Sequence, residues 1–258
     1  MKLRVLGCSG GIGGNLRTTS FLLDHDVLID AGTGVGELSL TELSMIDHIF
    51  VTHSHLDHIA CIPFLVDSVG FMRDRPLTVY ASEETLDILR QHIFNWKIWP
   101  DFSEIPNAQQ PYMRYQSIEL GETVVLEGRK ITAIPANHVV PAVGYQLDSG
   151  KASLVFSGDT TTNDALWKVV NKITNLRYLI IETAFSNSEM DLAVLSKHLC
   201  PSLVAEELVK LKQEAEIFIT HLKPGELELT MRETEACVRE LRSDLHPKML
   251  LNNQVFEF

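Results

Sequence analysis

Three histidines and an aspartate lie within six positions in the run Thr52-His53-Ser54-His55-Leu56-Asp57-His58. The residues before this run have the pattern of a buried strand, and side chains two apart in an extended chain point the same way. His53 and His55 can therefore bind one ion. An apolar, helix-like stretch begins after His58, so the chain turns there and directs Asp57 and His58 to a neighbouring position. The spacing predicts a site for two metal ions.

Each of these residues, taken singly, has a purely structural explanation. Asp57 could be the N-cap of a helix, and a histidine could be a core residue with its hydrogen bonds satisfied. That explanation would have to hold four times over, so a metal site accounts for the run more simply. Nitrogen and oxygen ligands favour zinc and leave manganese and iron(II) open, because ligand type does not separate these ions. We expect two divalent ions, with zinc as the first candidate.

Length and charge limit the classes of protein and of partner. The chain has 258 residues, 45% of them hydrophobic, and no Pro, Gly or Ser run divides it, so we expect a single domain over residues 1–258. Its 22 basic and 34 acidic residues give a net charge of −12. This charge disfavours tRNA and other long nucleic acids unless a local basic patch exists, but it is compatible with small phosphorylated substrates.

The location of the protein is predicted from its first residues and its cysteines. Residues 1–6 enter a strand-like run at once, which leaves no room for a signal peptide, and no later apolar stretch is long enough to span a membrane. Cys8, Cys61, Cys200 and Cys237 are isolated, so they form neither zinc-binding pairs nor a dense disulfide pattern. We expect a cytoplasmic protein with no membrane partner.

Short β-type runs alternate with helix-like stretches, which predicts a layered α/β architecture. Strands are expected at Leu3–Leu6, Phe21–Leu23, Val27–Ile29, Ile49–Val51, Thr78–Ala81, Ile131–Pro135, Gly144–Leu147, Ala152–Phe156, Tyr178–Ile181 and Ile217–Thr220. Helices are expected at Glu83–His92, Asn163–Lys172, Leu203–Lys212 and Leu227–Arg242.

Two further segments have an unusual composition. The glycines between Gly7 and Gly14 match neither phosphate-binding glycine motif, so we interpret them as a tight turn between strands. Phe94 to Phe102 is rich in aromatic residues and could be a lid, a wall for base stacking, a dimer contact or ordinary core.

A two-metal site needs more ligands than one motif provides, and three later loops offer them. His138, Asp159 and His221 each lie beside a strand-like run, and loops at strand ends are where a rigid sheet presents catalytic groups. Singly, Asp159 could be a turn residue and His221 a helix cap. Their order after the first motif favours the metal interpretation.

In this order of motifs the chain resembles the metallo-β-lactamase superfamily. The resemblance runs across nearly the whole chain and implies a single-domain α/β fold, an αββα sandwich with the metals at one edge. It also implies two sets of metal ligands. The first ion would be bound by His53, His55 and His138, and the second by Asp57, His58 and His221, with Asp159 bridging them.

Within that superfamily, Glu182-Thr183-Ala184-Phe185-Ser186-Asn187, His198-Leu199-Cys200-Pro201 and Thr220-His221-Leu222-Lys223-Pro224 resemble class II 3',5'-cyclic-nucleotide phosphodiesterases. The related tRNA 3'-processing endonucleases carry a long tRNA-binding arm between the third histidine and the bridging aspartate. Here that interval is 159 − 138 = 21 positions, too short for the arm. Cys61 and Val69 depart from the class II signature, which indicates a divergent member or a sister phosphodiesterase family.

The resemblance and the chemistry together imply a mechanism. Two cations about 3.5 to 4 Å apart can present a shared water as a bridging hydroxide, which attacks a cyclic nucleotide such as cAMP or cGMP to give the 5'-monophosphate. His198, oriented by Glu182, would be the acid for the leaving group, and Asp57 would help to orient the nucleophile.

Other functions stay open on the same scaffold. They are an RNA 3'-end, oligonucleotide or cyclic-dinucleotide phosphodiesterase, a thioester or lactone hydrolase, and a non-catalytic metal-binding scaffold. The aromatic segment and the habit of the family also admit a homodimer. No role is expected for His25, His48, His92 or His246.

Overall fold

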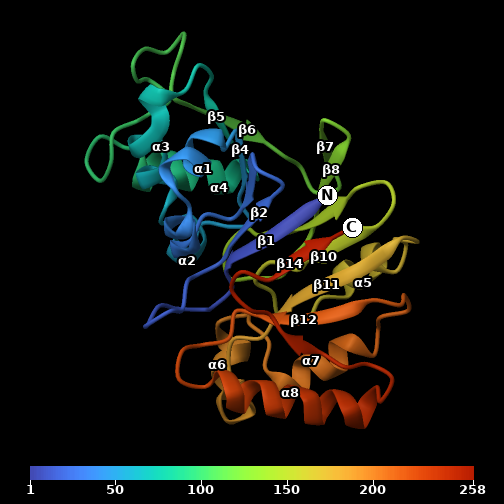
Figure 1. Cartoon of the computed structure of the whole chain (residues 1–258). Helices are drawn as coiled ribbons and strands as arrows, with labels where there is room; N and C mark the ends of the chain where they lie inside the picture. The colour runs from blue at the N-terminus through green and yellow to red at the C-terminus, as the bar shows by residue number, and fades with distance from the viewer.

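Residues 1–258 form two seven-stranded β-sheets that pack face to face, with helices on both outer surfaces, in a computed structural model of the chain (Figure 1). The first sheet has the spatial order β14 (Val255–Glu257), β1 (Lys2–Gly7), β2 (Ser20–Leu23), β3 (Val27–Ile29), β4 (His48–Phe50), β5 (Leu77–Ala81) and β6 (Met113–Ser117). The second has the order β13 (Lys248–Met249), β12 (Glu216–Thr220), β11 (Leu176–Glu182), β10 (Ser153–Phe156), β9 (Val143–Asp148), β8 (Arg129–Pro135) and β7 (Thr123–Leu126).

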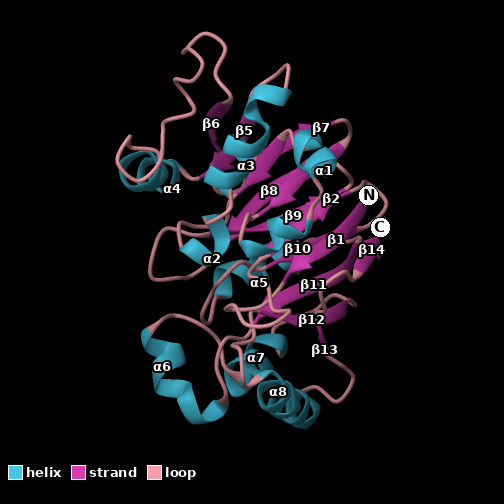
Figure 2. Ribbon diagram, turned by 60° about the vertical axis from the view of Figure 1, so that its left-hand side comes forward, coloured by secondary structure: helices cyan, strands magenta, loops and turns pink.

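The helices form the two outer layers, which confirms the expected αββα sandwich (Figure 2). Over the first sheet lie α1 (Leu40–Met45), α2 (Leu56–Ile59), α3 (Ile62–Val69) and α4 (Glu83–Ile88). Over the second lie α5 (Asp164–Val170), α7 (Pro201–Leu208) and α8 (Leu227–Leu241), while α6 (Met190–Leu195) lies beside them. Single helical turns occur at Thr33–Glu37, Gly70–Met72, Leu89–Ile93 and Asn187–Glu189.

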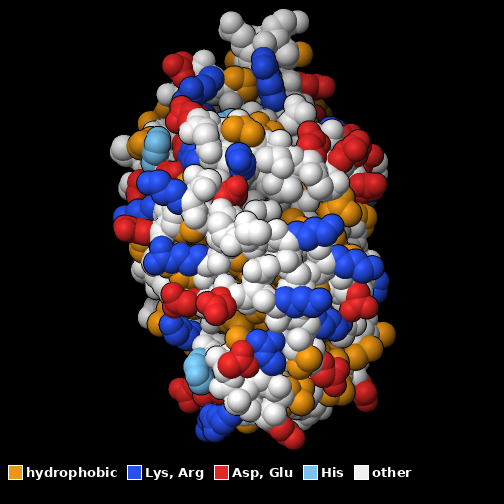
Figure 3. All heavy atoms as spheres, turned by 90° about the vertical axis from the view of Figure 1, so that its right-hand side faces the viewer, with side chains coloured by type: hydrophobic (Ala, Val, Ile, Leu, Met, Phe, Trp, Pro, Cys, Tyr) orange, Lys and Arg blue, Asp and Glu red, His pale blue; other side chains and the backbone are white.

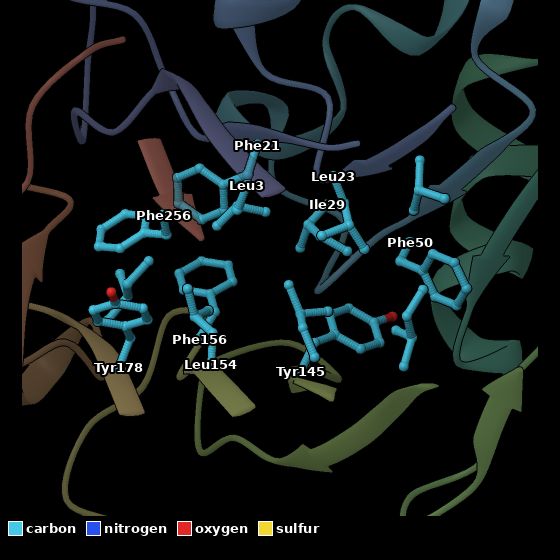
Figure 4. Packing of buried hydrophobic residues seen from close by; sticks show 14 of the residues in the cluster. Leu3, Phe21, Leu23, Ile29, Phe50, Tyr145, Leu154, Phe156, Tyr178 and Phe256 are labelled. Carbon is cyan, nitrogen blue, oxygen red and sulfur yellow. The ribbon is translucent and has the colours of Figure 1, made fainter. Parts of the chain in front are cut away.

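Successive side chains of a strand point to opposite faces of its sheet, so the buried apolar residues form three layers. One layer lies between the two sheets, and one lies between each sheet and the helices that cover it. In β3, Val27 and Ile29 point into the core between the sheets, while Leu28 points outward to the helices. In β10, Phe156 points inward and packs edge-on against Phe21 of the first sheet, at 5.0 Å between ring centroids (Figure 4). The outward positions need helices to cover them, so both faces of both sheets are buried.

The structure differs from the sequence-based expectation mainly at edges and boundaries. The edge strands β6, β7, β13 and β14 were not expected: most side chains of β6 are exposed, exposed and half-buried positions alternate along β7, and β13 and β14 have only two and three residues. Helices α1 and α6 were not expected either. The helix expected at Leu203–Lys212 begins two residues earlier, at Pro201, since proline is well suited to the first turn of a helix. The strand expected at Ile49–Val51 is shifted by one residue, to His48–Phe50.

The aromatic segment Phe94 to Phe102 is divided between core and surface. Phe94 and Phe102 are buried among the apolar residues that cover the outer face of the first sheet. Trp96 and Ile98 point outward and are 59% and 65% exposed. Core packing therefore explains the two phenylalanines, and the two exposed residues are left without a structural partner.

The two ends of the chain lie side by side. β14 pairs with β1, and the amino group of Met1 donates a hydrogen bond of 2.7 Å to the carbonyl of Phe258 (Figure 1). Among the helices, none combines the length and the apolar character that crossing a lipid bilayer requires.

A buried ion pair ties the two sheets together. The guanidinium of Arg129 in β8 donates to both carboxylate oxygens of Asp26, at 2.5 and 2.8 Å, and their side chains are only 9% and 10% exposed. Burial alone would raise the pKa of Asp26, but the hydrogen bonds and charge of Arg129 outweigh it and lower the pKa below its ordinary value.

We expect Arg129→Met to lower the free energy of unfolding by about 3 kcal/mol at pH 7, since it leaves Asp26 charged and unpaired. A depressed pKa stabilises the fold above the unfolded-state value of about 3.9 and stops doing so as the pH falls through the folded-state value. The gap between wild type and variant should therefore narrow below about pH 4. Urea unfolding at pH 7 and at pH 3.5 measures both quantities. The exposed neighbour Lys130→Met is the control, and unchanged stability of Arg129→Met at pH 7 would contradict the assignment.

Candidate metal centre

The chemically interesting side chains follow five strands of the two sheets and meet at one edge of the sandwich. His53 comes after β4, His138 after β8, Asp159 after β10 and His221 after β12, while Glu182 is the last residue of β11. Figures 1 and 2 place α2, which carries Asp57 and His58, and α6 on the same side of the sandwich. The edge therefore brings together residues that are up to 168 positions apart (221 − 53).

Two groups of side chains at this edge have the composition and spacing of metal sites. Within each group the donor atoms all lie within 4.8 Å of one another. The first group is His53, His55, His138 and Asp159, and the second is Asp57, His58, Asp159 and His221. Asp159 belongs to both groups, its Oδ2 lying 3.3 Å from Nε2 of His58 and 3.7 Å from Nε2 of His53. All seven ligands expected from the sequence are thus placed together.

The histidines meet a specific test for metal binding. Nε2 of His53, Nε2 of His58 and Nδ1 of His221 are buried and have no hydrogen-bond partner in the protein. A buried polar atom without a partner is costly, so these atoms need a ligand of another kind. A neutral imidazole lone pair directed at a divalent cation satisfies the need, and the mixed nitrogen and oxygen donors suit zinc and its neighbours.

One ring nitrogen of His53, of His58 and of His138 is held by the protein, which fixes how each ring faces. Nδ1 of His58 is 2.7 Å from Oδ2 of Asp30, and Nδ1 of His53 is 3.0 Å from the hydroxyl of Thr52. Nδ1 of His138 is 3.0 Å from the carbonyl of Lys197. Such partners orient metal-binding imidazoles and raise their basicity.

Asp30 is a functional residue that the sequence reasoning missed. Its side chain is fully buried, and it accepts from the backbone N–H of Thr52 at 2.7 Å as well as from His58. It lies in the left-handed region at φ 56°, directly after the apolar strand β3. A carboxylate at the end of an apolar strand was the available signal, the same one that identified Asp159.

The charge states suit metal binding. Burial lowers the pKa of His138 to about 4 and that of His221 to about 3, so both rings are neutral near pH 7. Burial alone would raise the pKa of Asp159, but the charge and hydrogen bond of His58 outweigh it and hold it well below the usual range. His58 itself differs from the other two histidines: burial alone would lower its pKa, but Asp159 and Asp30 outweigh burial and raise it well above the usual value, so a cation that binds at Nε2 must displace its proton.

Glu182 and His198 form a hydrogen-bonded pair beside the two ligand groups. Nδ1 of His198 donates to Oε1 of Glu182 at 2.7 Å, and the Glu182 carboxylate also accepts from the backbone N–H groups of Thr160 and Leu199. The ring of His198 is 4.8 Å from that of His138 and 5.2 Å from that of His221, between centroids. Burial alone would lower the pKa of His198, but the charge and hydrogen bond of Glu182 outweigh it and raise the pKa.

The glycine-rich loop between β1 and β2 is a turn, as expected, but it also lies against the metal centre. The N–H of Gly10 donates to the carbonyl of Leu222, and a Cβ on Gly10 would come within 2.4 Å of the His221 carbonyl. Only glycine permits this contact. The loop therefore supports His221, which is itself in the left-handed region at φ 66°.

A separate surface cavity lies away from this edge. Its volume is about 440 Å³, and it is lined by His25, Asp47, Arg73, Arg75 and neighbouring residues. Asp47 accepts from both arginines, so their positive charges are paired within the protein. None of the metal-binding candidates lines this cavity.

Comparison with known proteins places the site in a family context. The sequence model of the β-lactamase superfamily domain matches residues 25–234. A probable 3',5'-cyclic-nucleotide phosphodiesterase from Yersinia pestis is 28% identical over 70% of this chain, and a ribonuclease Z from Methanocaldococcus jannaschii is 30% identical over 56% of it. The matched parts span 58% and 46% of these relatives' own lengths. The unliganded yeast PDE1 structure superposes with a TM-score of 0.83 at 19% identity and covers 98% of both chains.

Proposed function

Because the chain belongs to the β-lactamase superfamily, we propose that it is a dinuclear metal-dependent phosphodiesterase that hydrolyses 3',5'-cyclic nucleotides to 5'-monophosphates. The observation that carries this proposal is the Glu182–His198 pair, held at 2.7 Å beside both ligand groups. A metal centre alone suits many hydrolytic reactions. A positioned acid next to it suits an ester whose leaving group is a strongly basic alkoxide.

In this proposal the seven side chains of the two ligand groups hold two divalent cations, most simply zinc. One cation takes His53, His55 and His138, the other takes Asp57, His58 and His221, and Asp159 is shared. Such ions, when bound, lower the pKa of a water molecule and neutralise phosphoryl oxygens. Asp57 is partly exposed, at 27%, so its carboxylate is also available to orient the attacking water.

His198 supplies what the cations do not, a proton for the departing 3' oxygen. The raised pKa keeps the ring protonated near neutral pH, and the bond from Nδ1 to Glu182 leaves Nε2 as the atom that donates. Glu182 also accepts from the backbone of Thr160, the residue after Asp159. The Glu182 carboxylate therefore holds both His198 and the loop that carries Asp159.

A small diester fits the molecule better than RNA does. Between His138 and Asp159 the chain forms only the short strands β9 and β10, with no projecting arm. Figure 3 shows the face that carries the chain termini, turned away from α2 and α6, where basic and acidic side chains are interspersed. The match to a ribonuclease Z nevertheless makes an RNA 3'-end or oligonucleotide phosphodiesterase the second candidate. Cyclic-dinucleotide hydrolysis and a non-catalytic scaffold are further alternatives.

We expect the metal-loaded protein to contain two ions per chain and to release 5'-AMP from cAMP. Metal analysis combined with a hydrolysis panel tests this, the panel being cAMP, cGMP, cyclic dinucleotides, a tRNA precursor and a thioester. Turnover of the tRNA precursor without cyclic nucleotides would support the second candidate. A fully metallated protein that cleaves no phosphodiester would refute the proposal.

A further inference from the structure

We propose that Lys223 is a substrate-recognition residue that binds the anionic phosphoryl group next to His198, an inference that rests on the proposed phosphodiesterase function. Lys223 follows His221 by two positions and is held at the same edge of the sandwich. It is not among the ligand groups, so its charge is additional to anything the metals contribute.

The ammonium of Lys223 is placed by two contacts. Its Nζ donates to the carbonyl of Gly10 at 2.8 Å and lies 5.8 Å from the ring centroid of Phe185. That ring is 5.7 Å from the ring of His198, between centroids. The ring of Phe185 therefore lies against both the ammonium of Lys223 and the ring of the proposed acid.

This ammonium has donors to spare. A lysine carries three N–H donors, and Gly10 accepts one of them. No carboxylate oxygen forms an ion pair with Lys223 within 4.0 Å, although the chain has 34 acidic residues. Lys248 offers a direct contrast, because its Nζ lies 5.6 Å from the ring of Phe218 and donates to Glu216 at 2.8 Å. The charge of Lys248 is neutralised within the protein, and that of Lys223 is not.

A free cation at this point answers a requirement of the proposed reaction. The protein has a net charge of −12, which repels an anionic diester unless the site itself is locally positive. Two unused N–H donors on the other contact of the Phe185 ring can bind phosphoryl oxygens that the proposed metal ions leave free. Charge-assisted hydrogen bonds of this kind are about twice as strong as neutral ones. The 5'-monophosphate product, with more negative charge than the diester, should be bound through the same contact.

The competing explanation is structural, because Lys223 also ties the glycine-rich loop to the segment after β12. That role would affect stability and metal content. It would not affect how strongly the protein distinguishes a nucleoside monophosphate from the bare nucleoside. Comparing adenosine 5'-monophosphate with adenosine therefore separates the two explanations without requiring turnover.

The experiment is calorimetric titration of the metal-loaded protein with each of these two compounds. We expect Lys223→Met to weaken binding of adenosine 5'-monophosphate by about 10-fold or more and to leave adenosine unchanged. Lys223→Arg should recover most of the loss, because it restores a cation. Lys248→Met, which removes the ion-paired lysine at the other ring, should bind both compounds as the wild type does. KM for cAMP should rise in Lys223→Met in parallel.

Two results would overturn the inference. One is an unchanged preference for the monophosphate in Lys223→Met, which would leave the metal ions as its whole cause. The other is loss of bound metal from Lys223→Met, which would show that Lys223 supports His221 instead of the substrate. Failure of the proposed function has a different signature, since the wild type would then cleave no diester whatever Lys223 binds.

Discussion

Asp159→Ala is expected to lose both metal ions and to lower kcat/KM on a phosphodiester by roughly 10³-fold or more, because the metals provide several kcal/mol of transition-state stabilisation. Asp159 is the one side chain common to both ligand groups and is 2% exposed. Its oxygens lie between 3.3 and 3.7 Å from nitrogens of His53, His58 and His221. Without it, the two ligand groups no longer share a carboxylate.

Metal content measured by mass spectrometry, alongside activity, checks this expectation. Asp67→Ala is a suitable control, because Asp67 is exposed on α3 and forms no hydrogen bond or ion pair. It should keep two ions and full activity. Retention of both ions by Asp159→Ala would contradict the bridging assignment, whatever happens to activity.

The grouping of these seven side chains could be predicted from the sequence because His53, His138, Asp159 and His221 follow strands, while His55, Asp57 and His58 come directly after His53. His53, His55, Asp57 and His58 are close in sequence, so local geometry alone suggested how they pair. His138, Asp159 and His221 needed the resemblance as well, since nothing local indicates that loops after three different strands meet. The two sheets bring them together, through pairings such as β10 with β11 and β11 with β12.

The residues that the sequence did not reveal are those whose role depends on the partner they contact. Asp30 is one acidic residue among 34 until the fold places it 2.7 Å from Nδ1 of His58. Nothing in the sequence distinguishes Lys223 from the other lysines. The structure does so, because it places the ammonium against the ring of Phe185 without an acidic partner. The edge strand β6 escaped prediction for a related reason, because most of its side chains are exposed and it carries no apolar run.

His198→Ala is expected to keep both metal ions and to lose about 10²- to 10⁴-fold in turnover of cAMP, the usual contribution of positioned acid catalysis. The 3' oxygen of a nucleotide leaves as a strongly basic alkoxide and needs a proton as its bond to phosphorus breaks. His198 is well placed to give it, since Glu182 holds the ring at 2.7 Å and raises its pKa.

Substrates with different leaving groups distinguish acid catalysis by His198 from a purely structural role of this residue. On bis-p-nitrophenyl phosphate the departing nitrophenolate is weakly basic and needs no proton, so the same variant should lose far less, less than about 10-fold, if acid catalysis is the main role of His198. An exposed histidine changed in the same way, His92→Ala, should affect neither substrate. Equal losses on the two esters would rule out the acid role. They would indicate instead that His198, whose ring lies 4.8 Å from that of His138, mainly holds the metal-binding histidines in place.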